Sequence, residues 1–489
     1  MKNLVRRSEV VLRGDPQRVI SRIFIPGEEE LIRGASRVND VLDRCLSLSA
    51  AQVHEELVET VANFSHRHRD LEGQFELHYS AVQHLIADED RLDVERKRLI
   101  GAYLTQEYAV EAAAYFNPSI VAHPDQTGLE PDHLRFVMSV RAVGEGHIST
   151  LAFRSGIIDP EGGIEVEPAS KFATTRAHRY TVLRNELVQQ SAKDAGIYTA
   201  DLQFLLGMLP DKFSPEELNS RLNLLKMHPD GLEHPYEFME TLQEIARNSY
   251  EVDFDEGTLL SERVLWPIAS DERRGIEDAR FVQVADAVGK ISYRATYTGF
   301  DGTHVVSRML ETNDFRTFSS LKLSGKAVQN KGVAFFPRPV DGRYCALSRW
   351  DRESNSIAYS DDGYHWDEIK NFQAPKQTWE LIQIGNCGSP IETDDGWLVI
   401  THGVGAMREY SISAVLLDLD KPEIMIGALS TPLLTPNPDE RNGYVPNVVY
   451  SCGSLVHRGK LIMPYGFSDY RTSFATMELS EVLAEMKPM

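Results

Sequence analysis

The second half of the chain is dominated by short runs of alternating apolar and polar residues that end in turn dipeptides. Such dipeptides stand at Asp301-Gly302, Asp341-Gly342, Asp362-Gly363 and Asp395-Gly396. An Asp-Gly pair between alternating runs is a strong hairpin signal, because glycine readily adopts the positive φ that these turns require. Groups of such strands recur about every 40–50 residues, a period typical of propeller blades. The pattern predicts an almost wholly β body from about residue 256 to 475.

The first half alternates between strand-like and helix-like segments. We expect an N-terminal arm and helical region over 1–113, a first propeller blade over 114–169, a helical insertion over 170–255, and the remaining blades with a short C-terminal helix over 256–489. Apolar residues at helical spacing support the first helical region, in which Ser49 is a candidate N-cap. The chain is therefore predicted to be mainly β with two helical additions.

Composition limits the kinds of partner that the chain can bind. It has 489 residues and a net charge of −22, from 51 basic and 73 acidic residues. Such a charge repels nucleic acid and anionic membranes, so neither is an expected partner. The four cysteines show no CxxC spacing, which argues against a metal site or a disulfide framework and favours a reducing cytoplasm. The N-terminus lacks the apolar core of a secretory signal, and no apolar run predicts a membrane-spanning helix.

Two adjacent carboxylates lie between arginines in the segment from Arg273 to Val282. In a regular strand, Glu277 and Asp278 would point to opposite faces of the sheet, so that one could face a pocket while the other pairs with an arginine. Glu277 would raise the pKa of Asp278 as a like charge, whereas Arg280, on the same face as Asp278, would lower it. The segment alone favours neither effect, and a surface charge cluster is an alternative interpretation.

With this segment and several others, the chain resembles glycoside hydrolase family 130, the β-mannoside phosphorylases and related β-mannosidases. The resemblance covers about 256–475 and a first blade at about 116–155, but not the helical segments. The matching segments, in chain order, are Gly275 to Arg280, Tyr293 to Gly302, Lys331 to Pro337, Tyr344 to Arg349, Trp379 to Gly385, Gly388 to Ile391, Gly396 to Val404, Tyr410, Leu416 to Asp418, Gly443 to Val448 and Tyr465 to Asp469. The resemblance implies a five-bladed β-propeller, in agreement with the strand period.

The resemblance also implies roles for particular residues. Asp278 is expected to be the acid that protonates the departing glycosidic oxygen, with the proton passing through a hydroxyl of the bound mannose. The expected phosphate-binding residues are Lys331, Arg349, Gln383, His402 and Tyr410. The expected substrate-binding residues are Asn117, Arg141, Glu277, Arg280 and Asp469. Inorganic phosphate is the expected co-substrate, and no metal or other cofactor is expected.

Three positions depart from the family pattern. Ala279 stands where proline is usual, Lys331 where arginine is common, and Gln383 where lysine is common. Lys331 keeps the charge but loses the bidentate fork of arginine, whereas Gln383 loses a charge altogether. Both changes predict weaker phosphate binding than in a typical relative.

Three functions remain open at this point. The first is an inverting β-mannoside phosphorylase, which releases mannose 1-phosphate and a shortened sugar. The second is a β-mannosidase, which Gln383 favours and which would need a base such as Glu145, Glu392 or Glu409. The third is a non-catalytic carbohydrate-binding propeller whose helical additions form an oligomerisation surface. We also expect a cytoplasmic homo-oligomer that binds an oligosaccharide or disaccharide.

Overall fold

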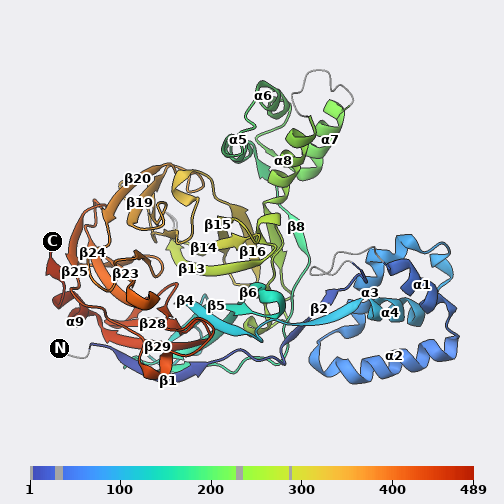
Figure 1. Ribbon diagram of the computed structural model, residues 1–489, viewed down its shortest axis with the longest axis horizontal. Coiled ribbons are helices and arrows are strands. Elements are labelled where there is room, and N and C mark those ends of the chain that lie inside the picture. Colours follow the sequence, from blue (N-terminus) through green and yellow to red (C-terminus); the bar gives the residue numbers. More distant parts are fainter. Residues whose placement is uncertain (1–3, 28–36, 227–234, 286–288) are drawn as a thin grey trace.

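The computed structural model describes residues 4–27, 37–226, 235–285 and 289–489. Figure 1 shows a large body of strands, with two separate groups of helices projecting from it. The prediction of a mainly β chain is confirmed. Residues 28–36 and 227–234, which fall inside the predicted helical regions, lie outside the described residues.

The strands of the body fall, over the described residues, into five antiparallel groups that follow one another along the chain (Figure 1). The first group contains β4 (Ala114–Ala122), β5 (Leu134–Val143), β6 (Ser149–Ile158) and β7 (Ile164–Val166). The second contains β13 (Gly275–Ala285), β14 (Ile291–Phe300), β15 (Val305–Thr312) and β16 (Thr317–Lys322). A single parallel pairing of Gly275 with Ser149 joins these two groups into one sheet.

The remaining groups repeat this pattern. The third contains β17 (Ala334–Phe335), β18 (Tyr344–Ser348), β19 (Asn355–Ser360) and β20 (Glu368–Gln373). The fourth contains β21 (Gln383–Asn386), β22 (Ile391–Thr393), β23 (Gly396–Val404), β24 (Tyr410–Leu417), β25 (Met425–Ala428) and β30 (Lys487–Pro488). The fifth contains β26 (Val449–Tyr450), β27 (Leu455–His457), β28 (Lys460–Phe467) and β29 (Arg471–Glu478), with the N-terminal strand β1 (Arg6–Leu12) paired to β29. Both ends of the chain are thus tied into the last two groups.

Clusters of buried apolar side chains lie between successive groups. Phe153 and Phe281 belong to the cluster between the first and second groups. Other clusters join the second group to the third, the third to the fourth, and the fourth to the fifth. Tyr115 and Phe474 belong to a cluster shared by the first and fifth groups. Because each group packs on its neighbours, residues far apart in sequence are brought to a common centre.

The predicted hairpin turns have the backbone that their glycines permit. Gly302, Gly342, Gly363 and Gly396 have φ values of 107°, 76°, 79° and 148°. Side chains other than glycine rarely adopt such angles, so these positions favour glycine for conformational reasons. The turn signal in the sequence is therefore physically grounded.

The N-terminal helices α1 (Val38–Ser47), α2 (Ala50–Phe64), α3 (Leu71–Val82) and α4 (Val94–Tyr103) have buried clusters of their own. The prediction that Ser49 caps a helix is confirmed, because its hydroxyl accepts from the backbone N–H of Gln52 in a capping box. The helices end earlier than expected. Residues Thr105–Ala109 form β3, which pairs with β2 (Val19–Ile23) and links the helices to the body (Figure 1).

The inserted helices α5 (Asn185–Asp194), α6 (Ala200–Gly207), α7 (Pro215–Lys226) and α8 (Pro235–Arg247) share a separate buried cluster. Two strands attach the insertion to the body, since β11 (Tyr250–Asp253) pairs with β16 and β8 (His178–Tyr180) pairs with β11. The expected C-terminal helix is α9 (Leu479–Ala484). Over the described ranges, no helix has both the length and the apolarity needed to cross a membrane.

Candidate active site

A cavity of about 190 Å³ is lined by residues from all five antiparallel groups. All but one of the predicted site residues line this cavity: Asn117, Arg141, Asp278, Arg280, Lys331, Arg349, Gln383, His402, Tyr410 and Asp469. The exception is Glu277, which is hydrogen-bonded to two of them. The fold therefore gathers residues from positions 117 to 469 around one small space.

The backbone at Asp278 departs from a regular strand. The pairing of β13 with β14 is interrupted between Glu277 and Arg280, and Asp278 has a φ of 54°. This bulge breaks the alternation of side chains. The alternation expected of a regular strand therefore does not hold, because Arg141 bonds to Glu277 at 2.7 Å and also lies 3.6 Å from the Asp278 carboxylate. The prediction that one carboxylate could face a pocket while the other pairs with an arginine is confirmed, since Asp278 lines the cavity and Glu277 does not.

Positive charges surround the carboxylate of Asp278. Burial alone would raise its pKa, but the charges of Arg141, Arg280 and Lys331 together outweigh this effect. Asn117 adds to them by donating from Nδ2 to Asp278 Oδ1 at 2.8 Å. The pKa of Asp278 therefore lies below its ordinary value, and this side chain is ionised in the free site at neutral pH.

Glu277 neutralises two of the neighbouring cations. Its carboxylate accepts from Arg141 Nη2 at 2.7 Å and from Lys331 Nζ at 2.5 Å. Glu277 is 5% exposed, so these contacts keep a buried charge paired. Lys331, predicted to bind phosphate, is thus already engaged in an ion pair.

Asp469 is the second carboxylate that lines the cavity. Burial raises its pKa to about 7, and the negative charges of Asp278 and Glu277 add to this effect. Arg141 and Arg408 act in the opposite direction. Close to neutral pH, Asp469 is therefore divided between its charged and neutral forms.

Two guanidinium groups of the cavity remain available for an external anion. Over the described residues, neither Arg349 nor Arg408 forms an ion pair, and Arg349 Nε is buried without a hydrogen-bond partner. The Arg349 side chain is half-buried, and a buried donor such as its Nε is costly without a partner unless a ligand supplies one. Arg408 follows β23 in a loop where Met407 and Arg408 have φ values of 55° and 57°.

His402 is neutral in this site. Its pKa lies well below the ordinary value, first because the ring is buried and second because Arg349 and Arg280 are close. Nδ1 lies 3.2 Å from the carbonyl oxygen of Asn386, which can only accept, so Nδ1 carries the proton. Nε2 is then an acceptor. The ring stacks on Tyr410 with 5.9 Å between centroids.

Several residues of the cavity have left-handed backbones. Asn117, Asp278, Arg408 and Asp469 have φ values of 52°, 54°, 57° and 45°. Such conformations cost about 1–3 kcal/mol each and persist only where the surrounding structure enforces them. They aim side chains away from the directions that regular strands allow.

Comparisons with known proteins point to one family. A family model of glycoside hydrolase family 130, described as beta-1,4-mannooligosaccharide phosphorylase, matches residues 250–488. The 1,2-beta-oligomannan phosphorylase of a Thermoanaerobacter species is 32% identical over 251 residues, which are 49% of this chain and 80% of that protein. The beta-1,2-mannobiose phosphorylase of Listeria innocua is 30% identical over 47% of this chain and 65% of that protein. A solved Listeria innocua beta-1,2-mannobiose phosphorylase aligns with a TM-score of 0.46 and 20% identity, over 77% of this chain and 92% of that chain.

The chain belongs to glycoside hydrolase family 130. The predictions of this family and of an enzyme are thereby confirmed. The matched range of 250–488 contains Asp278, the predicted phosphate-binding residues and Asp469. Asn117 and Arg141 lie outside it and join the cavity through the first group of strands. The chemical roles of all these residues stay predictions.

Some cavity residues were missed in the sequence. Arg408, Asn386 and Tyr450 line the cavity of this family 130 enzyme but were not predicted. Arg408 stands two residues before Tyr410, so a cation close to a predicted ligand could have signalled it. Tyr450 stands two residues after the matched segment Gly443 to Val448, and its hydroxyl accepts from Arg280 Nη2 at 2.7 Å. Over the described residues, no cluster of three or more His, Cys, Asp or Glu side chains could hold a metal ion.

Proposed function

We propose that this enzyme cleaves a β-mannoside by phosphorolysis with inversion at the anomeric carbon. A phosphate oxygen would attack C1 of the mannose while the bond from C1 to the glycosidic oxygen breaks. A proton from Asp278, relayed by a mannose hydroxyl, would reach the departing oxygen. The products would be mannose 1-phosphate and a sugar shortened by one residue. The curated relatives that match the chain bear phosphorylase names, which supports this proposal.

The observation that carries the proposal is the state of Arg349. Its guanidinium lines the cavity, and its Nε is buried with no partner over the described part of the chain. Hydrolysis by water would leave this cation unpaired, whereas phosphorolysis requires a group to hold the incoming phosphate in line. An anionic co-substrate satisfies Arg349.

The balance of charge also favours a dianion. Over the described residues, the cationic side chains of the cavity are Arg141, Arg280, Lys331, Arg349 and Arg408. The carboxylates are Asp278 and Asp469, with Glu277 bonded behind them. Because His402 is neutral, five positive charges face at most three negative ones, and this excess of at least two suits the two negative charges of hydrogen phosphate. Arg408 would offset the lysine that Gln383 replaces.

The tautomer of His402 suits hydrogen phosphate. Nδ1 donates to Asn386, so Nε2 can accept a hydrogen bond. Hydrogen phosphate carries one hydroxyl that can donate to such an acceptor. Tyr410, stacked on His402, offers a phenolic O–H to a phosphate oxygen.

Phosphate binding would also prepare Asp278 for its role as acid. In the free site, nearby cations hold the pKa of Asp278 below its ordinary value. A bound dianion would offset these cations and raise that pKa, so that Asp278 gains the proton it must donate.

The sugar has a candidate partner in Asn117. Its Oδ1 is buried without a partner over the described residues and can accept a hydrogen bond from a sugar hydroxyl.

Hydrolysis is the second candidate, because the cavity contains another carboxylate. Asp469 has a pKa of about 7 and would serve as the base that activates water. The bases considered from sequence fit less well. Glu392 pairs with Arg338 and Glu409 with Arg441, and neither lines the cavity. Glu145 does not line it either.

Incubation of the enzyme with β-1,2- and β-1,4-mannobiose, with and without inorganic phosphate, tests the proposal. Phosphorolysis predicts mannose 1-phosphate, with no turnover when phosphate is omitted. Equal release of free mannose under both conditions would establish hydrolysis instead. Saturable binding without any product would contradict both reactions.

We propose a five-bladed β-propeller as the architecture that holds this site. In support, each antiparallel group shares a buried cluster with the next, and the first shares one with the fifth. The pairing of β1 with β29 would close the ring. The four-part division of the chain, a homo-oligomer and the need for no cofactor besides phosphate stay predictions. Cytoplasmic location is a further proposal, consistent with four free, buried cysteines.

A further inference from the structure

We propose that a second cavity, between the third and fourth groups of strands, binds a neutral sugar. This cavity has a volume of about 340 Å³ and is lined by β23, β24, β25 and the segment 371–380. It shares no lining residue with the catalytic cavity. Its volume falls within the usual range of small-molecule sites, about 300–1,000 Å³.

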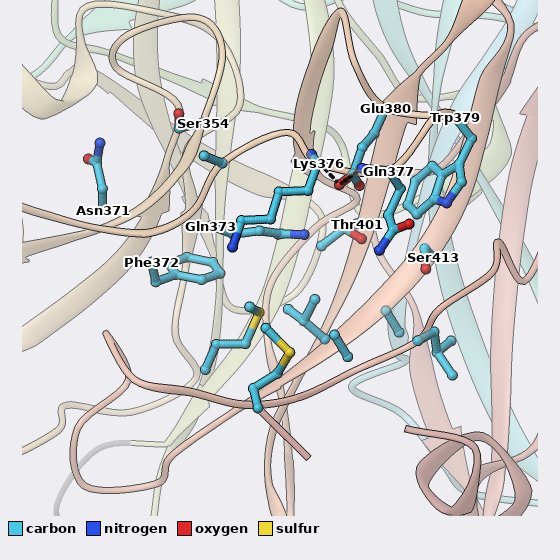
Figure 2. A pocket seen from close by; sticks show the side chains of 17 residues that line it. Ser354, Asn371, Phe372, Gln373, Lys376, Gln377, Trp379, Glu380, Thr401 and Ser413 are labelled. Carbon is cyan, nitrogen blue, oxygen red and sulfur yellow. Dashed lines mark hydrogen bonds between the residues drawn. The ribbon is translucent and has the colours of Figure 1, made fainter. Parts of the chain in front are cut away.

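The cavity has one polar and one apolar side. Figure 2 shows the labelled amide and hydroxyl side chains on one side and unlabelled apolar side chains on the other. The polar side includes Asn371, Gln373, Gln377, Thr401 and Ser413. The apolar residues that line the cavity include Val415, Met425, Ala428, Leu429 and Met489. A pyranose ring, with one face of C–H groups and hydroxyls at its edge, matches this division.

Two buried polar atoms of this cavity have no partner. Over the described residues, Thr401 Oγ1 and Trp379 Nε1 are buried and make no hydrogen bond. Thr401 is 1% exposed, so its hydroxyl has lost water without compensation. Such atoms are uncommon, because each costs free energy unless a ligand completes it. An indole N–H and a hydroxyl together can donate to sugar oxygens and accept from a sugar hydroxyl.

The charges around the cavity favour a neutral ligand. Glu380 is 3% exposed, and its carboxylate accepts from the backbone N–H groups of Lys376 and Gln377 at 2.9 and 3.0 Å (Figure 2). The Glu380 carboxylate therefore binds the backbone of its own loop rather than a ligand. Asn371 and Gln373 accept from Ser356 and Asn355 through their amide oxygens, which leaves their amide nitrogens as donors. Apart from Glu380 and the exposed Lys376, the side chains on this rim are neutral donors and acceptors, which suit hydroxyl groups better than an ion.

The indole of Trp379 is held against the neighbouring strand. A Cβ atom added to Gly403 would lie 2.5 Å from Trp379 Cζ3, so only glycine leaves room for the ring. This close approach fixes the indole at the cavity wall. A fixed aromatic ring and a buried hydroxyl form a pre-organised site rather than an incidental surface hollow.

Titration of the Asp278→Asn enzyme with mannobiose, cellobiose and maltose, without phosphate, tests the proposal. Calorimetry and tryptophan fluorescence should both detect saturable binding of at least one disaccharide. Thr401→Val keeps the side-chain shape and removes the hydroxyl, and Trp379→Phe keeps an aromatic ring and removes the N–H. Each should weaken this binding at least tenfold.

Matched controls separate the site from general effects on the fold. Ser139→Ala removes another buried hydroxyl without a partner, and Trp266→Phe removes another indole, both outside this cavity. Neither should change the binding. Binding that Thr401→Val and Trp379→Phe leave unaltered would belong to the catalytic cavity and would overturn the proposal, as would the absence of binding. Formation of mannose 1-phosphate is measured separately on the wild-type enzyme, so failure of one proposal leaves the other intact.

Discussion

The two faces of β23 serve cavities of opposite character. His402 lines a cavity crowded with arginines and carboxylates, whereas the adjacent Thr401 lines one with amides and hydroxyls. Neighbouring residues of a strand point to opposite faces, so a single strand can contribute to both. The two cavities differ because different segments pack against the two faces of β23. The fifth group brings Tyr450 and Asp469 to one side, and the segment 371–380 covers the other.

The two cavities also differ in backbone strain. Asn117, Asp278, Arg408 and Asp469, which line the candidate active site, have left-handed backbones. Over the described residues, every non-glycine residue that lines the second cavity has a negative φ. Strain of this kind commonly accompanies catalytic geometry, whereas a binding site can be assembled from regular strands and a loop. The comparison predicts that substitutions in the candidate active site change activity and stability more than substitutions in the second cavity.

Asp278→Asn should have the largest effect. An amide cannot deliver the proton to the departing oxygen, so kcat should fall about a thousandfold or more while the fold is retained. Product formation from mannobiose and phosphate measures the effect. Asp341→Asn is a matched control, because Asp341 lies outside the cavity at a turn with a φ of 50°, which asparagine tolerates. Near wild-type turnover in Asp278→Asn would contradict the role of this residue.

Arg349→Ala should have the second-largest effect, and this effect should be on the use of phosphate. Loss of a charged hydrogen-bond donor costs about 1.5–3 kcal/mol, so KM for phosphate should rise about 10–100-fold, with a smaller change in sugar affinity. Arg408→Ala should raise KM for phosphate less, because Arg408 is exposed. Arg349→Lys should recover part of the loss. If KM for phosphate were unchanged in Arg349→Ala, the proposal that Arg349 binds the phosphate anion would be contradicted.

The location of the candidate active-site cavity was more predictable than the geometry inside it. The sequence motifs correctly placed Asp278, Arg349 and His402 in one cavity, because motifs shared with a family occupy the same positions in its fold. Sequence alternation failed at Asp278, because a bulge changes the direction of the side chain. The ion pair of Lys331 with Glu277 depends on two different groups of strands, and no local pattern records it.

The second cavity was not predicted at all. Thr401 and Trp379 belong to phrases that matched the family, but their neighbours come from the third group of strands and from β25. Local patterns predicted the turns and the cap at Ser49, since these depend on a few adjacent residues. Contacts between groups depend on packing and must be read from the structure.

Asp469→Asn should alter stability in a pH-dependent way. The folded enzyme holds the pKa of Asp469 at about 7, above the ordinary value of 3.8, so this group favours folding below pH 4 and loses that contribution as pH rises to 7. The amide of asparagine does not ionise, so the Asp469→Asn variant does not lose this stability as pH rises. This variant should therefore be more stable than wild type at pH 8, by about 2 kcal/mol after allowance for solvent screening, and nearly equal at pH 4.

Denaturant unfolding of both proteins at pH 4, 6 and 8 measures this difference. Activity of Asp469→Asn should fall, because the sugar loses an anionic acceptor. Arg408→Ala offers a contrasting case. Removal of its positive charge should raise the pKa of Asp469 further and lower stability at pH 8. A stability difference that does not change with pH would show that Asp469 is ionised throughout this range.

Thr401→Val should change the free energy of unfolding least, and it should raise stability, whereas most core substitutions lower it. Its hydroxyl is buried without a partner, so valine of similar shape should stabilise the free protein by about 1 kcal/mol. Thr472→Val is the matched control, because the buried Thr472 hydroxyl donates to the carbonyl of Tyr115 at 3.0 Å and its loss should cost about 1 kcal/mol. Thermal unfolding of the two variants without sugar distinguishes the cases. If Thr401→Val destabilises as much as Thr472→Val, a bound water already satisfies Thr401, and the second cavity then offers a sugar no unpaired hydroxyl.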